Sequence, residues 1–466
     1  MTGSIQLNAL EVFLQGHPTI KYTLPSSPDY PAARQIFNGA RRDNPLAIVR
    51  PQSPSDVATL IRYAKSSSLP FTIRAGGHNL EGLTLVEGAL LIDLRALTAV
   101  TVALDRKSAT VQGGTLQHEL ANTLWAEGLV TPTGAIPSVG YVGWATYGGY
   151  GPFSSHWGLG VDQILGATIV NADGEIVKAD ESLLQGIRGG GGLYGVILDL
   201  TIKVYPLTSL LAGAIIFDSS DITKTCVDFN AAHEKLLETE GLPPQLTLQQ
   251  IAFNAPTGRA FAAIFVWSGA NIEEGQAWSE KIANLGPLVA NTVTPTNIPE
   301  WFDGNGALVP PVASGSAYTH NISRVSPAIA ETIGDSLASM PADPGTMMSI
   351  HQLRGPSTEP QAHSSLFAAR EPHYMLEFLG FATQKDKDVQ EKSEKWAAQM
   401  AEDTKQADLE YLLPSAYVSL YNSTVQAKSS AQLIDKIYVS KVKTLKELKA
   451  KFDPEDVFGL AVPALK

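Results

Sequence analysis

The stretch FTIRAGGHNLEG, residues 71–82, places a histidine directly after two glycines at the end of a short apolar run. The run FTIR is typical of a buried strand, which is expected to end at Arg74. Glycine lets a backbone turn tightly or approach a ligand closely, so Gly76 and Gly77 allow either arrangement. His78 is therefore either an ordinary loop residue or a side chain presented to a bound molecule.

The composition is that of a large globular protein. The chain has 466 residues, of which 44% are hydrophobic and 17% are charged, and this length predicts two domains. A net charge of −12 argues against a nucleic-acid partner, which a basic surface would favour. Cys226 is the only cysteine, so an intramolecular disulfide and a cysteine metal cluster are excluded. No histidine pair has metal-ligand spacing supported by other ligands, and we expect no metal.

Three features of the sequence bear on where the protein works. The first twenty residues lack the basic start and the continuous apolar core of a signal peptide. No stretch is apolar for long enough to cross a membrane, and the ending VPALK is not a peroxisomal address. We therefore expect an intracellular, cytoplasmic protein with no membrane partner.

Short strands and helices alternate up to about residue 206, where the composition changes. Ser53 and Pro54 begin a predicted helix, and Asp105–Lys107 and Asp173–Gly174 predict hairpin turns. The alternation in GVILDLTIKVYPL predicts a strand with its even-numbered apolar residues on one face and an end at Pro206. Longer strand candidates follow, among them AFAAIFVWSG (260–269) and HYMLEFLGF (373–381). The last fifty residues predict one periodic helix, with apolar positions at Leu433, Ile437, Leu445, Leu448 and Phe452.

Four glycine clusters lie within the first 200 residues. They are RAGGHN (74–79), VQGGT (111–115), TGAIPSVGYVGWATYGGYGPFSSHWGLGVDQI (133–164) and IRGGGGLYGV (187–196). Each adjoins a predicted strand, so together they can line a groove whose backbone N–H groups meet an anionic pyrophosphate. Taken singly, each is equally typical of a turn. A Rossmann fingerprint and a P-loop are disfavoured, because GGYGPF opens no helix of the required kind and no Gly-Lys-Ser/Thr triplet follows a glycine loop.

The order and spacing of these clusters, followed by KFDPEDVF (451–458), resemble the berberine-bridge-enzyme-like flavoproteins of the vanillyl-alcohol-oxidase superfamily, which include many fungal FAD-linked oxidoreductases. The resemblance covers about residues 45–206 and resumes at about 410–466. It implies an α+β fold with a two-subdomain FAD-binding domain and an antiparallel-sheet substrate domain. The implied division is 1–206 for the FAD-binding part, 207–414 for the substrate domain, and 415–466 for a segment returning to the FAD domain.

The resemblance also implies a cofactor site. In the family, the loop that matches RAGGHN wraps FAD, and its histidine is bonded to a ring methyl, so His78 is expected to form one covalent link. A neutral imidazole nitrogen is a suitable nucleophile for the electrophilic form of that methyl. The other positions expected to contact FAD are Arg74, Ala75, Gly76, Gly77, Asn79, Gly114, Gly134, Ser138, Val139, Gly140, Gly143, Gly148, Gly149, Gly151 and Val196.

Two motifs depart from the family pattern. Ile136 stands where many relatives carry a second flavin-linking cysteine, and Cys226 lies far outside that motif, so a single covalent bond is expected. The family's Tyr-x-Asn-Tyr appears as AYVSLYN (416–422), in which Ser419 replaces the asparagine. Tyr417 matches the first tyrosine and is the candidate catalytic base, if its pKa is lowered. An ordinary half-buried tyrosine at this position, or a role for Tyr421 instead, stays open.

Several other side chains have both a functional and a structural interpretation. In plant relatives, a small side chain at the position of Val139 leaves oxygen access to the flavin, and simple packing is the alternative. His156 lies in a loop of the FAD domain, where it is either near the cofactor or hydrogen-bonded elsewhere. The predicted strands of the substrate domain carry His351 and, on one face of a second strand, His373, Met375 and Glu377, which either line the substrate pocket or are ordinary structural residues.

The resemblance predicts an FAD-dependent oxidoreductase of oxidase type, acting in secondary metabolism. A small organic substrate would pass a hydride to covalently bound FAD while an adjacent group loses a proton, and dioxygen would then be reduced to hydrogen peroxide. One alternative is a flavin-containing enzyme that catalyses a non-redox cyclisation, which the altered YVSLYN leaves open. A binding protein that has lost catalysis is the other alternative.

Overall fold

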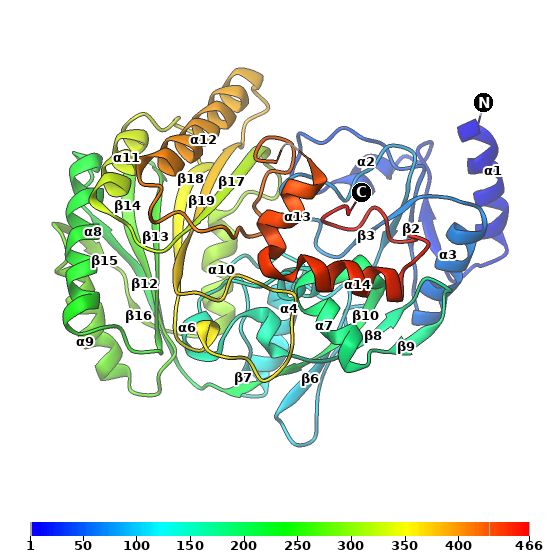
Figure 1. The fold of residues 1–466 in the computed structure, drawn as a ribbon, viewed down its shortest axis with the longest axis horizontal. Coiled ribbons are helices and arrows are strands. Elements are labelled where there is room, and N and C mark those ends of the chain that lie inside the picture. Colours follow the sequence, from blue (N-terminus) through cyan, green and yellow to red (C-terminus); the bar gives the residue numbers. More distant parts are fainter. Residues whose placement is uncertain (1, 428, 466) are drawn as a thin grey trace.

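The computed structural model describes residues 2–427 and 429–465 (Figure 1). Met1, Lys428 and Lys466, which the predicted divisions 1–206 and 415–466 include, lie outside the described residues. Three sheets of four, five and eight strands make up most of the architecture, together with a two-stranded pair. This is the α+β arrangement predicted from the sequence.

The first sheet carries the strand that leads into RAGGHN. Its order is β1-β2-β4-β3, with β1 antiparallel to β2 and the other pairs parallel. The Ser53 side chain caps α3 and Pro54 opens it, as predicted, and the buried face of this helix packs in the core of the first sheet. The elements are α1 (Thr2–Gln15), β1 (Lys21–Thr23), α2 (Tyr30–Arg34), β2 (Ala47–Arg50), α3 (Pro54–Ser66), β3 (Phe71–Arg74) and β4 (Leu90–Asp93).

The second sheet is antiparallel and has the order β5-β6-β10-β8-β9. Both predicted hairpins are confirmed, since β5 pairs with β6 and β8 with β9. The elements are β5 (Val100–Val102), β6 (Ser108–Gln112), α4 (Gln117–Ala126), β7 (Leu129–Val130), α5 (Tyr141–Thr146), α6 (Ser154–Trp157), η1 (Gly160–Gln163), β8 (Ile164–Val170), β9 (Ile176–Lys178), α7 (Glu181–Gly190), η2 (Gly191–Tyr194), β10 (Val196–Lys203) and β11 (Tyr205–Pro206).

Strand β10 differs from its prediction in two respects. Its pairing with β8 shifts register between Ile197 and Asp199, and such a bulge exchanges the two faces of a strand. Leu198 therefore packs in the core of the first sheet, whereas Leu200 packs in the core of the second. The strand also ends at Lys203, and Pro206 belongs to the short β11, which pairs with β7.

The third sheet is antiparallel, with the order β15-β12-β14-β13-β18-β19-β17 and with β16 beside β12. In Figure 1, helices α8, α11 and α12 lie along its outer face. The elements are β12 (Leu210–Phe217), α8 (Ile222–Thr239), β13 (Leu246–Ala255), β14 (Gly258–Trp267), α9 (Ile272–Ala283), β15 (Leu288–Asn291), β16 (Thr294–Thr296), α10 (Ile298–Leu308), β17 (Ser314–Ile322), α11 (Pro327–Ala338), β18 (Thr346–Leu353), η3 (Gly355–Thr358), β19 (His373–Ala382) and α12 (Lys387–Ala407).

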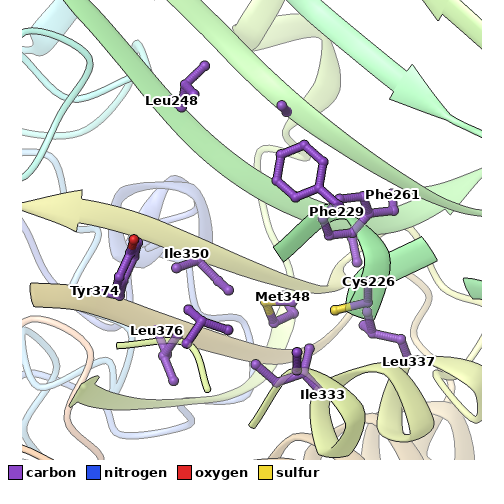
Figure 2. Close-up of a cluster of buried hydrophobic side chains, with 14 of the residues drawn as sticks. Cys226, Phe229, Leu248, Phe261, Ile333, Leu337, Met348, Ile350, Tyr374 and Leu376 are labelled. Atoms are coloured by element: carbon purple, nitrogen blue, oxygen red, sulfur yellow. The ribbon is translucent and has the colours of Figure 1, made fainter. Parts of the chain in front are cut away.

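The core between this sheet and its helices contains the single cysteine. Figure 2 shows Cys226 and Phe229 of α8 together with Met348 and Ile350 of β18 in one cluster of buried side chains. Cys226 is fully buried and burial raises the pKa of its thiol to about 12, so it serves as a small apolar side chain.

The C-terminal segment contains two helices where the sequence predicted one. Helix α13 (Ser430–Tyr438) ends at Val439, whose φ is +45°, and the turn η4 (Val439–Lys441) leads into α14 (Val442–Phe452). A left-handed residue cannot continue a right-handed helix, so the chain changes direction there. Leu433, Ile437, Leu445 and Leu448 still pack together, in the core of the second sheet.

Candidate flavin site

The loop that carries His78 is packed backbone against backbone with residues 138–140. A Cβ on Gly76 would lie 2.3 Å from the Gly140 nitrogen, and a Cβ on Gly140 would lie 2.6 Å from the Gly76 nitrogen. No side chain fits at either position, and Gly77 has a φ of +75°, which favours glycine. Gly76 and Gly140 are 64 residues apart in the sequence (140 − 76), so two separate glycine clusters meet at one place.

His78 is held on both of its sides at this junction. Its Nε2 lies 2.9 Å from the Ser138 hydroxyl, and its ring stacks on Phe37 with centroids 4.8 Å apart. The Phe37 N–H donates to the Gly77 carbonyl at 3.1 Å, which ties the stacking partner to the same loop. Burial lowers the pKa of His78 to about 4, so the imidazole is neutral near pH 7. The residue is thus a fixed, uncharged imidazole and not a freely solvated loop histidine.

Three of the expected FAD contacts have packing roles that explain them. Arg74 is 1% exposed, and its guanidinium donates to the Ala33 carbonyl at 2.7 Å. Val196 is buried in the core of the first sheet. A Cβ on Gly114 would lie 2.0 Å from the Leu94 carbonyl oxygen. The Arg74 and Val196 side chains are therefore enclosed, and a contact with FAD at these positions stays a prediction.

The segment 133–164 folds around one tryptophan. Gly134 and Gly149 each face the Trp144 ring, and a Cβ on Gly151 would lie 1.9 Å from the Thr133 carbonyl oxygen. The Trp144 indole donates to the Tyr150 carbonyl at 3.1 Å. These glycines permit the close path of the loop that ends in Gly148–Gly151. By contrast, a Cβ on Gly143 would meet nothing within 4 Å, so open space adjoins that glycine.

The remaining three positions shape the two loops. The Asn79 side chain accepts from the Leu83 N–H at 3.0 Å, and Ala75 lies against Gly140. Val139 is half-buried, and its carbonyl accepts from the Gln117 N–H at 2.9 Å. The prediction that Val139 controls oxygen access stays untested.

Polar atoms without partners lie beside these loops. Within the described chain, the side chains of Thr115, Gln117, Thr133 and Tyr194 each have a buried polar atom that makes no hydrogen bond. Leaving such an atom unpaired costs about 1–3 kcal/mol. A polar ligand between the clusters would supply the missing hydrogen-bond partners. A cavity of about 470 Å³ also lies between the loop after His78, at Glu81 and Leu83, and the C-terminal segment, at Val418, Tyr421 and Leu433. The unpaired hydroxyl and amide groups beside the glycine clusters therefore fit a cofactor with many acceptors, as FAD is.

Tyr417 touches the glycine-rich loop. A Cβ on Gly148 would lie 3.2 Å from Cε2 of Tyr417, and the Tyr417 ring lies 4.8 Å from that of Tyr150. Burial raises the pKa of Tyr417 to about 12, although hydrogen bonds from Ser419 and the Gly149 backbone oppose this shift. The condition set for Tyr417 as the catalytic base, a lowered pKa, is therefore not met in the protein alone, and its catalytic role stays a prediction. Tyr421 is committed elsewhere, since its hydroxyl donates to the Gln426 carbonyl at 2.7 Å.

The predicted face of the β19 strand is confirmed. Met375 packs with Tyr150 and Tyr417, and His373 accepts a hydrogen bond from Tyr150, so this face points toward the glycine-rich loop. Across the sheet, Ser349 is opposite Glu377 and His351 is opposite Met375. Directly opposed residues share a face, so β18 adds its polar side chains to the same surface.

Glu377 is the functional candidate whose role the sequence did not show. Its carboxylate accepts from the Ser349 hydroxyl and lies 3.3 Å from Nε2 of His351. Burial alone would raise the pKa of Glu377, but the charge and hydrogen bond of His351, with the Ser349 bond, lower it below its usual value. The charge of Glu377 in turn raises the pKa of Tyr417, so the two groups are within electrostatic reach. The alternation in HYMLEF was the only sequence signal for Glu377. Its contact with His351 had no signal, because the two residues lie on different strands more than twenty residues apart in the sequence.

His156 has a structural role in this arrangement. Its Nδ1 lies 2.8 Å from the Ser268 hydroxyl, and its ring stacks on Trp157 at 4.2 Å. No group of three or more potential metal ligands occurs in the part of the chain that the structure describes. None of the described helices combines the length and the apolar character needed to cross a membrane.

Glycine loops that close around a neutral histidine, together with a carboxylate from the large sheet and a tyrosine from the C-terminal segment, are the site of a flavin-dependent oxidoreductase. The model of the FAD binding domain family matches residues 45–180. The FAD-linked oxidoreductase aurO of Gibberella zeae is 30% identical over 457 residues, which cover 97% of this chain and 87% of aurO. The chain belongs to the berberine-bridge-enzyme-like FAD-linked oxidoreductases of the vanillyl-alcohol-oxidase family, and its cofactor is FAD.

One further relative is similar in sequence over part of the chain, and one solved structure is similar in fold over nearly all of it. (R)-6-hydroxynicotine oxidase of Paenarthrobacter nicotinovorans is 33% identical over 196 residues, which cover 41% of this chain and 43% of that oxidase. The structure of the BBE-like protein 28 of Arabidopsis thaliana superposes with a TM-score of 0.82 at 21% identity, covering 94% of this chain and 96% of the plant protein. The predicted fold class, with an FAD-binding domain and a large antiparallel sheet, is thus confirmed.

Proposed function

We propose that this enzyme oxidises a small organic molecule of secondary metabolism, using FAD attached once through His78 and dioxygen as the electron acceptor. The observation that carries the proposal is the position of Tyr417 and Glu377. Tyr417 touches Gly148 of the glycine-rich loop, and Glu377 faces the same side from the sheet. A substrate held between the loop and the sheet would meet the flavin on one side and a proton acceptor on the other.

Glu377 is the proposed proton acceptor. Its pKa is lowered, so it is ionised at neutral pH, whereas the raised pKa of Tyr417 keeps that phenol protonated. Nε2 of His351 lies 3.3 Å from the Glu377 carboxylate and would stabilise its charge. Once the carboxylate has taken up the proton, His351 would accept a hydrogen bond from it. Tyr417 would donate a hydrogen bond to the substrate and fix its orientation. FAD, when bound, supplies the two-electron acceptor.

Support for the covalent link comes from the state of His78. The imidazole is neutral, is fixed by Phe37 and Ser138, and lies where two glycine loops meet. Ile136, two residues before Ser138, offers no nucleophile, so His78 is the single proposed link. Acid precipitation should leave the yellow colour in the pellet, and a colourless pellet with FAD in the supernatant would contradict the link.

Anaerobic mixing with a panel of alcohols, amines and aromatic polyketides tests the redox function. The correct substrate should bleach the flavin absorbance, and admission of air should restore it with release of one hydrogen peroxide per substrate. Substrate conversion without bleaching or peroxide would instead support a non-redox cyclisation. Binding with neither conversion nor bleaching across the panel would support a protein that has lost catalysis.

A further inference from the structure

The two ring nitrogens of His78 differ in their hydrogen bonding. Nε2 lies 2.9 Å from the Ser138 hydroxyl, whereas no hydrogen bond occupies Nδ1 among the described residues. A neutral imidazole carries one N–H and one lone pair, and the hydrogen bond made by one nitrogen decides which nitrogen holds the proton. The Ser138 hydroxyl can accept from Nε2–H or donate to a bare Nε2, so it is placed to select between the two tautomers of His78.

The surroundings allow a lone pair on Nδ1. Ser138 is exposed, so its hydroxyl can turn its own proton toward solvent and accept from Nε2–H, which leaves the lone pair of the neutral ring on Nδ1. Stacking on Phe37 at 4.8 Å fixes the plane of the ring, and the packing of Gly76 against Gly140 fixes the separation of the two loops. The imidazole thus has little freedom to exchange its two nitrogens.

We propose that Ser138 is a positioning residue for flavin attachment, which holds the Nε2 proton of His78 so that Nδ1 forms the bond to FAD. This inference rests on the covalent link in the proposed function. The Ser138 side chain does not itself react with the cofactor. Its contribution is the choice of nitrogen and the orientation of the ring, both of which must be set before the bond can form.

Attachment of His78 to the flavin methyl is a two-electron oxidation. A bond forms between Nδ1 of His78 and the methyl carbon on the benzene ring of the flavin, and one C–H bond of that methyl breaks. The methyl proton and the Nε2 proton leave, the latter along its hydrogen bond to the exposed Ser138. Two electrons stay in the flavin ring, which is thereby reduced. Dioxygen takes up these two electrons and two protons and leaves as hydrogen peroxide, so one peroxide accompanies each bond formed.

Substitution of Ser138 tests the inference directly. Full-length apoprotein from a riboflavin-starved host is mixed with FAD in air, and covalent flavin is followed by fluorescence of the denatured chain in a gel. Ser138→Ala should bind FAD reversibly but form the covalent bond about ten- to a hundredfold more slowly than wild type. Ser138→Thr keeps a hydroxyl at the same carbon and should restore most of the rate.

The site of attachment supplies a second readout. Proteolysis followed by NMR of the flavinylated peptide should show the bond at Nδ1 in the wild type and in Ser138→Thr. A wild-type rate in Ser138→Ala, attachment of the wild type through Nε2, or loss of all FAD binding in Ser138→Ala would each overturn the positioning role. A wild type that holds FAD only reversibly would also overturn it, whereas substrate-dependent bleaching of that reversible FAD would leave the redox function standing.

Discussion

The Tyr150 hydroxyl donates a hydrogen bond of 2.9 Å to Nε2 of His373, and this bond joins the glycine-rich loop to the large sheet. The contact of the other ring nitrogen, Nδ1, fixes the direction of this hydrogen bond. Nδ1 of His373 lies 2.6 Å from the Glu371 carbonyl, which can only accept, so Nδ1 carries the proton and Nε2 is the acceptor. Both side chains are buried, so the bond is one of the fixed contacts between the sheet and the loop that Tyr417 touches.

Removal of this bond should destabilise the protein. Tyr150→Phe deletes the donor and leaves Nε2 of His373 buried without a partner, which costs about 1–3 kcal/mol. Urea denaturation should therefore show a free energy of unfolding lower by that amount. Tyr22→Phe is the matched control, because Tyr22 is exposed and should lose nothing measurable. Equal stability of Tyr150→Phe and the wild type would contradict the proposed contact.

His373 should also make stability depend on pH. Burial lowers the pKa of His373 to about 4, from its ordinary value of 6.5. Between these values the unfolded chain binds more protons than the folded chain, so the free energy of unfolding falls as the pH drops from 6.5 to about 4. His373→Gln cannot titrate, and its stability should fall less steeply across this window in urea titrations at several pH values. A slope identical to that of the wild type would assign the titration to other groups.

The contact between the two glycine loops gives a test of the cofactor cradle. A Cβ on Gly76 would lie 2.3 Å from the Gly140 nitrogen, so Gly76→Ala must push the loops apart and should lower the FAD content of the purified protein severalfold. Gly304→Ala is the control, since a Cβ there meets nothing within 4 Å. The ratio of flavin to protein absorbance measures both variants. Full FAD content in Gly76→Ala would show that the close approach is not needed.

Much of the fold could be predicted because local signals agree with the final structure. The cap at Ser53, the turn at Asp173–Gly174 and the alternation in HYMLEF each depend on neighbours within a few residues. The break at Val439 could not be predicted, because a valine with a φ of +45° has no sequence signature. The bulge after Ile197 was equally invisible, since it depends on how β10 pairs with β8.

The candidate site divides in the same way. Glycine spacing located the loops around His78, because each cluster is a local motif. The pairing of Glu377 with His351 depends on the register of two strands, which a single sequence does not provide. Whether the pKa of Tyr417 is lowered could not be predicted from the sequence, because it depends on how deeply the ring is buried and on which rings pack against it.

A second covalent link to the flavin can be tested by introducing a cysteine at position 136. Ile136 occupies the position of the linking cysteine in the resembling family, and the path of its loop is held by contacts of Pro137 and Val139 with α4. The double variant His78→Ala, Ile136→Cys should therefore carry some covalent flavin on the peptide that contains residue 136, because a thiolate is a competent nucleophile. His78→Ala alone should carry none. Peptide mass spectrometry distinguishes the variants, and flavin mass on any peptide of His78→Ala would exclude a single link.

The last prediction separates Glu377 from Tyr417 as the proton acceptor. Glu377→Gln removes the acceptor without changing its shape and should slow anaerobic flavin reduction about a hundredfold or more, whereas Tyr417→Phe should slow it less than about tenfold. Glu371→Gln, on an exposed side chain close by, is the control. The pH profile gives the independent readout. Because the pKa of Glu377 is lowered and that of Tyr417 is raised to about 12, transfer to Glu377 predicts a reduction rate that is flat between about pH 6 and 9, whereas transfer to Tyr417 predicts a rate that climbs with pH throughout this range. A climbing profile that is abolished in Tyr417→Phe would return the catalytic role to the tyrosine.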